Sequence, residues 1–94
     1  MWLKTQEEEL VNLSRANTIY IKTVGSDKWR LFAEFWASPG GDMGANLWEG
    51  DHAQCAFALS QIAEALRAML PFLDINEVMQ PLMSTEPSIG ERGW

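Results

Sequence analysis

The stretch from Lys28 to Ser38 reads KWRLFAEFWAS and is the longest strand pattern in the chain. Because side chains alternate between the two faces of a strand, Leu31 and Phe35 should share one face. Phe32 and Trp36 then point to the opposite face, so both faces carry large aromatic side chains. A chain of 94 residues has material for one core. The sequence therefore raises the question of what covers the second face.

Further strand patterns before and after this stretch predict an antiparallel sheet. Residues 18–24 read TIYIKTV, rich in β-branched and aromatic side chains, and the turn sequence GSDK joins them to the long strand. Residues 45–49 read ANLWE and resume a strand pattern after a loop rich in glycine and proline, with Leu47 and Trp48 expected on opposite faces. MWLKT and LVNL near the start predict a short hairpin. We therefore expect an antiparallel meander of four to five strands.

From Asp51 onward the hydrophobic period changes from two to about 3.5 residues, which indicates an amphipathic helix. Its apolar stripe comprises Cys55, Leu59, Ile62, Leu66, Met69 and Leu73. Asp51 is placed to cap this helix, with Gln54 three positions on as in a capping box. Pro71 should end the helix near Leu70.

The segment after this helix carries a second capping pattern, Asp74 followed by Glu77, which predicts one or two helical turns before Pro81. The expected fold class is α+β: a meander of four to five strands, packed by one long C-terminal amphipathic helix, plus a short terminal helical segment. Residues 1–83 should form a single domain. Residues 84–94, which include Trp94, read as a polar C-terminal tail.

The composition argues against several classes of function. A formal charge of −6 opposes binding to nucleic-acid phosphates and to anionic membrane surfaces. With one cysteine and one histidine, a single copy can form neither an internal disulfide nor a Cys/His metal site. No apolar run is long enough to cross a bilayer, and no secretory signal pattern opens the chain. We expect a cytoplasmic protein with no metal, no cofactor and no membrane partner.

Catalytic motifs such as a nucleophile elbow or a phosphate-binding glycine loop are absent from the sequence. His52 is the candidate for chemistry, because Cys55 follows three residues later on a neighbouring helical face. A Cys/His dyad would need hydrogen-bond reach and a third orienting group. Cys55 instead falls in the apolar stripe, where a cysteine usually behaves as a small buried hydrophobe. We therefore expect a protein that is not an enzyme, with a site at His52 between subunits as the alternative.

The second aromatic face predicts that the protein acts by association. Exposed apolar patches usually mark interaction sites, and two-fold dimers are the commonest oligomers. We expect a homodimer formed by the aromatic sheet face, with sheets or edges apposed, and another protein as the alternative partner. The candidate contact residues are Tyr20, Arg30, Phe32, Glu34, Trp36, Trp48 and Phe57. Glu34 should pair across strands with Arg30 or Lys22, or else act as a charge that prevents unwanted pairing.

A second interpretation is a platform for single-stranded nucleic acid. Aromatic side chains on a sheet face can stack bases at about 1–3 kcal/mol per base, and Lys22, Lys28 and Arg30 lie on the same strands. Strands followed by one long helix resemble the single-stranded nucleic-acid-binding fold of the positive-cofactor-4 and Whirly type. That resemblance implies a nucleic-acid ligand, whereas the acidic composition argues against one.

The N-terminal run MWLKT followed by LVNLSRANTIYI resembles the start of a group of short bacterial proteins of unknown function. Those proteins open with Met-Trp, a Lys-Thr pair, a turn and Leu-Val-Asn-Leu, and they end with a helix. The resemblance covers residues 1–21 and the general layout. It implies a bacterial source and no particular activity.

Overall fold

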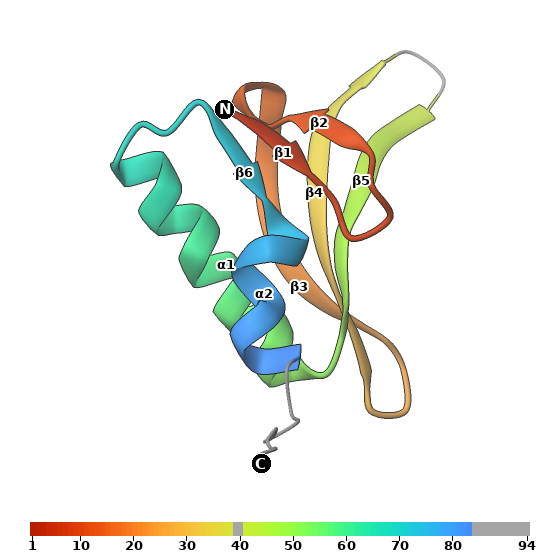
Figure 1. The fold of residues 1–94 in the computed structure, drawn as a ribbon. Helices are drawn as coiled ribbons and strands as arrows, with labels where there is room; N and C mark the ends of the chain where they lie inside the picture. Colours follow the sequence, from red (N-terminus) through yellow and green to blue (C-terminus); the bar gives the residue numbers. More distant parts are fainter. Residues whose placement is uncertain (39–40, 84–94) are drawn as a thin grey trace.

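The structure, a computed structural model, describes residues 1–38 and 41–83 and the side chains of all but 36–38 and 41–43 of these. In chain order the elements are β1 (Trp2–Lys4), β2 (Leu10–Asn12), the 3-10 helix η1 (Leu13–Arg15), β3 (Ala16–Gly25), β4 (Lys28–Ser38), β5 (Gly41–Gly50), α1 (His52–Arg67), β6 (Phe72–Asp74) and α2 (Ile75–Met83) (Figure 1). The fold class is α+β, as the sequence predicts. The polar tail, residues 84–94, lies outside the described residues.

The strands form two sheets instead of one meander (Figure 1). The main sheet is antiparallel and has the order β3-β4-β5, whereas the small sheet has the order β2-β1-β6. β1 and β2 form the expected antiparallel hairpin, but β6, which follows α1, pairs parallel to β1. The prediction of one meander is wrong because η1 separates β2 from β3, which turns the hairpin away from the main sheet. β6 escaped prediction because three residues are too few to show a period.

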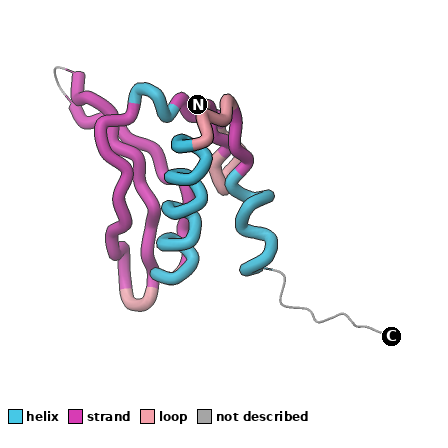
Figure 2. The backbone as a smooth tube through the Cα atoms, turned by 90° about the vertical axis from the view of Figure 1, so that its left-hand side faces the viewer, coloured by secondary structure: helices cyan, strands magenta, loops and turns pink. Residues whose placement is uncertain are grey.

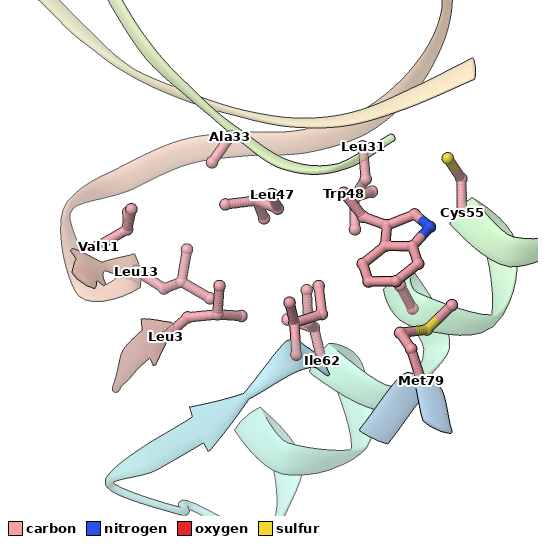
Figure 3. Close-up of a cluster of buried hydrophobic side chains, with 12 residues drawn as sticks. Leu3, Val11, Leu13, Leu31, Ala33, Leu47, Trp48, Cys55, Ile62 and Met79 are labelled. Atoms are coloured by element: carbon pink, nitrogen blue, oxygen red, sulfur yellow. The ribbon is translucent and has the colours of Figure 1, made fainter. Parts of the chain in front are cut away.

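One core lies between the main sheet, the small sheet and α1. Figure 2 shows how these backbone elements are arranged, and Figure 3 shows the buried side chains of the core. Leu31 and Ala33 of β4 are fully buried in it, together with Leu3 of β1. Ile62 of α1 completes its centre. The predicted alternation along β4 is therefore confirmed: the face with Leu31 and Phe35 packs on the core.

A bulge in β5 turns two consecutive side chains into this core. Leu31 pairs with Trp48, but its neighbour Phe32 pairs with Asn46, so Leu47 is the extra residue of β5. Leu47 is fully buried and Trp48 is only 4% exposed (Figure 3). The expectation that Leu47 and Trp48 lie on opposite faces is wrong, because the extra residue shifts the alternation. Trp48 is a core residue and does not contribute to the outer aromatic face.

α1 begins where the sequence predicts. The Asp51 carboxylate accepts a hydrogen bond from the backbone N–H of Gln54 at 2.8 Å, and the Gln54 side chain accepts one from the backbone N–H of Asp51 at 3.3 Å. This is the predicted capping box. The buried positions of the helix are Cys55, Ala58, Ile62 and Ala65, so the predicted stripe was wrong at Leu66 and Met69, which are exposed.

A Schellman motif ends α1 at Arg67, before Pro71 could do so. The Leu70 N–H donates to the Ala65 carbonyl and the Met69 N–H donates to the Leu66 carbonyl, both at 3.0 Å. Met69 occupies the left-handed region with φ of 60°. That position usually belongs to glycine, because a Cβ is strained there.

Replacing Met69 by glycine should therefore stabilise the protein. The side chain of Met69 is almost fully exposed, so its loss removes little packing. We expect Met69→Gly to raise the free energy of unfolding by about 0.5–1 kcal/mol, measured by urea denaturation. Ala68→Gly is the matched control, because Ala68 is right-handed with φ of −82° and should become less stable. A destabilised Met69→Gly would contradict the assignment.

α2 follows β6 directly. Asp74 caps it as predicted, but its side chain accepts a hydrogen bond from the Asn76 N–H at 3.1 Å instead of from Glu77. The helix continues to Met83 with Pro81 inside it. The prediction of an end before Pro81 was wrong. The φ of proline is compatible with a helix, and the missing N–H of Pro81 removes one backbone hydrogen bond without ending this helix.

Gln6, in the turn between β1 and β2, joins the small sheet to the main sheet. Its backbone N–H donates to the Leu47 carbonyl at 3.0 Å. Its side chain donates to the Glu49 carbonyl at 3.2 Å and accepts from the Glu49 N–H at 2.8 Å. Asn76 of α2 holds the same turn by donating to the carbonyls of Thr5 and Gln6 at 3.4 and 3.3 Å. The turn therefore covers part of the free edge of β5.

Removing the Gln6 side chain should destabilise the fold. Gln6→Ala leaves a partly buried N–H and C=O of Glu49 without these partners, so we expect a loss of about 1–2 kcal/mol in the free energy of unfolding. Gln80→Ala, at an exposed position of α2, is the control and should change stability by less than about 0.5 kcal/mol. Equal losses in the two variants would show that the bridge contributes nothing.

Candidate association surface

The outer face of the main sheet, which points away from the core, holds the predicted aromatic pair. Tyr20 of β3 lies opposite Phe32 of β4, with the rings edge to face and their centroids 5.8 Å apart. The Lys22 ammonium lies 4.2 Å from the centre of the Phe32 ring. The same ring packs so closely over Gly44 that no Cβ would fit there. Phe32, on the central strand, is therefore half-buried by its own chain. Tyr20 lies beside it on the edge strand β3.

Charged side chains form the next row of this face. Arg30 donates to one Glu49 carboxylate oxygen at 3.0 Å, and the Lys28 ammonium lies 3.4 Å from the other. The expected pairing of Glu34 with Arg30 or Lys22 is wrong. Arg30 pairs with Glu49 because the register of β5 places that carboxylate directly opposite, and Lys22 is drawn over the ring of Phe32.

These contacts lower the pKa of the Glu49 carboxyl below its ordinary value. The hydrogen bond from Arg30 is the main cause, the Lys28 ammonium adds to it, and partial removal from water acts in the opposite direction. A carboxyl with a lowered pKa in the folded state contributes stability above its unfolded pKa. This contribution is lost as the pH falls through the folded pKa.

Glu49→Gln should therefore reduce the acid sensitivity of the fold. We expect a lower urea midpoint than the parent at pH 7 and a smaller fall of that midpoint below about pH 5. Glu64→Gln is the control, because its carboxylate forms an exposed ion pair with Arg67 on the surface of α1 and should change little. An acid response identical to that of the parent would contradict the role of Glu49.

The two edges of the main sheet differ. The β5 edge is covered at Leu47 and Glu49 by Gln6. β3 forms the other edge. Its Ala16 N–H donates to the Leu13 carbonyl of η1, and within residues 1–38 and 41–83 no other backbone hydrogen bond reaches the strand from a segment other than β4. Bulges at Asn17 and Val24 leave a regular stretch, residues 18–23. An edge strand of this kind presents free N–H and C=O groups that another strand can pair with.

An apolar groove of about 320 Å³ runs beside this edge, between β3 and α1. Ile19 lines it from β3, and Leu59, Ala63 and Leu66 line it from α1. A strand added to β3 would place alternate side chains in this groove and the others beside Tyr20. We call the β3 edge, the groove and the adjoining Tyr20 the association surface.

The outer face of the small sheet is a second exposed apolar area, which the sequence analysis missed. Trp2 and Phe72 lie opposite each other on β1 and β6 and are 49% and 48% exposed, and Leu10 of β2 is 62% exposed. An ion pair between Lys4 and Asp74 at 3.9 Å borders this face. The signal available in the sequence was Phe72 directly after Pro71, where the helical pattern stops.

Several predicted contact residues lie away from the association surface. Trp48 is in the core, and Phe57 of α1 is half-buried against it. The backbone of Trp36 belongs to β4, but its side chain lies outside the described residues. Tyr20 and Phe32 are thus the predicted aromatic residues that the structure brings together.

The structure separates the roles of His52 and Cys55. His52 is exposed, and its ring packs edge-on against Trp29 at 4.8 Å. Cys55 is fully buried, and burial raises the pKa of its thiol. No hydrogen bond joins the two side chains in the described part of the chain. This arrangement disfavours a thiolate nucleophile.

The described residues contain no cluster of three or more His, Cys, Asp or Glu side chains arranged to hold a metal ion. Among the same residues, no helix has the length and apolar character needed to span a membrane. No family model, curated protein or solved structure matches the chain. A function must therefore be inferred from the geometry of this chain.

Proposed function

We propose that this protein is not an enzyme and acts by association, as a homodimer in which two copies pair their β3 edges. The observation that carries the proposal is the difference between the two edges of the main sheet: Gln6 covers the β5 edge, whereas no described segment covers residues 18–23 of β3. Pairing would extend the two main sheets into one sheet of six strands. It would also bring the aromatic faces of both copies side by side.

The distribution of charge favours contact at this edge. The chain carries a net charge of −6, so two copies repel each other in general. Glu7, Glu8 and Glu9 are exposed in the turn that covers the β5 edge. β3 contains no acid, and Lys22 is its one charged residue. The β3 edge is thus a place where two acidic copies can approach at low electrostatic cost.

The geometry supports a nucleic-acid platform less well. A base could reach the face of the Phe32 ring only after displacing Lys22, because the opposite side packs over Gly44. Arg30 and Lys28 already share the carboxylate of Glu49. The cations that would bind phosphates are therefore engaged within the chain.

Light scattering at micromolar concentrations tests the proposal. We expect a mass twice the 10.6 kDa of one chain. Ala63→Glu should weaken the dimer about tenfold or more, because it places a carboxylate in the apolar groove. Ala53→Glu, an exposed alanine of the same helix outside the groove, makes the same change of charge and should leave the dimer intact.

Two results would overturn the proposal. The first is a monomeric mass throughout the micromolar range, which contradicts homodimerisation itself. The second uses Leu10→Glu on the outer face of the small sheet. If that variant dissociates the dimer and Ala63→Glu does not, the copies meet through the small sheet instead of the β3 edge.

A further inference from the structure

The regular part of β3 can pair with a second copy of itself in few registers. Around a two-fold axis, one residue faces its own copy, and residues equally distant from it pair with each other. The bulges at Asn17 and Val24 restrict regular pairing to residues 18–23. Within these limits, only registers centred on Tyr20 or on Ile21 pair five residues in succession.

The position of Lys22 separates these two registers. Centred on Ile21, the two Lys22 side chains lie on the same face as diagonal neighbours, about 7–8 Å apart. Centred on Tyr20, each Lys22 faces the partner's Thr18, and the two Lys22 positions are four residues apart along the strands, about 13 Å. That separation exceeds the Debye length at physiological salt, about 8 Å. Electrostatic repulsion therefore favours Tyr20 at the axis.

The inner face favours the same register. Centred on Tyr20, Ile19 faces the partner's Ile21 on both sides of the axis, which makes two apolar pairs next to the grooves. Centred on Ile21, each Ile19 faces the partner's Thr23, which is exposed in this chain, and only one isoleucine pair remains. Apolar side chains that face each other across strands stabilise a sheet, so the register with two isoleucine pairs is favoured.

We infer that two copies pair their β3 strands antiparallel with Tyr20 on the two-fold axis. This inference rests on the homodimer proposed above and names its register. The outer face then carries four aromatic rings in one row, because each Tyr20 already contacts Phe32 in its own chain. The Tyr20 side chain of the second copy would cover the outer side of the Tyr20 ring. A second copy, and not an unrelated strand, repeats each of the off-axis pairings, Thr18 with Lys22 and Ile19 with Ile21, twice.

Cysteine cross-linking tests the register. Cys55 can remain in place because it is fully buried, and the parent chain serves as the background. Directly opposite residues have Cβ atoms about 4.5–5.5 Å apart, close to the spacing of a disulfide. We expect Tyr20→Cys to form a covalent dimer under mild oxidation at least ten times faster than Ile21→Cys or Lys22→Cys, seen as a doubled mass without reductant.

A second measurement keeps the Tyr20 ring in place. Because Thr18 should face the partner's Lys22, a mixture of Thr18→Cys and Lys22→Cys chains should give a covalent heterodimer, and neither variant alone should cross-link.

Tyr20→Lys should weaken the dimer tenfold or more by placing two ammonium groups opposite each other, whereas Tyr20→Phe should preserve it.

The outcomes distinguish the register from the dimer. A dimeric mass with fastest cross-linking at Ile21 or Lys22 overturns the Tyr20 register and leaves the homodimer standing. A dimeric mass with no cross-linking at any of these positions overturns β3 pairing as a whole. A monomeric mass overturns the homodimer together with its register.

Discussion

The side chain of Gln6 forms the hydrogen bonds of a short strand, one to the N–H and one to the C=O of Glu49. With the backbone bond from Gln6 to Leu47, they hold the β1–β2 hairpin against the edge of β5. Because the hairpin is held there, Leu3 of β1 is fully buried in the common core and the small sheet has a place to form. The same bonds cover one edge of the main sheet, and in the described part of the chain β3 is the edge that stays uncovered along residues 18–23.

The core of this chain also depends on a local irregularity of β5, the bulge at Leu47. A regular strand would send either Leu47 or Trp48 to the outer face, whereas the bulge buries both. A small domain gains from this arrangement, since it has few residues with which to fill a core. Tryptophans consequently serve different purposes here: Trp48 fills the core, and Trp2 lies half-exposed on the small sheet.

The outer face of the main sheet is partly covered by the chain itself. Lys22 lies over Phe32, and Phe32 in turn packs over Gly44, which leaves Tyr20 at the border of the open edge. The edge is flanked by an apolar groove on its inner side, and β3 carries no acid in a chain that is otherwise strongly acidic. These properties together favour a second copy as the molecule that completes the sheet.

The sequence by itself determined the features that depend on neighbouring residues. The alternation along β4, the hairpin of β1 and β2 and the capping box at Asp51 could all be predicted, because each arises from contacts within a strand, a turn or one helical turn. The tertiary structure alone decided the division into two sheets, the burial of Trp48, the partner of Arg30 and the open edge at β3. Each of these depends on the register between segments far apart in the chain: Gln6 meets Glu49, and β6 meets β1. Periodicity shows which face a residue takes within its own strand, but it carries no information about which strand lies beside it or where an extra residue shifts the pairing.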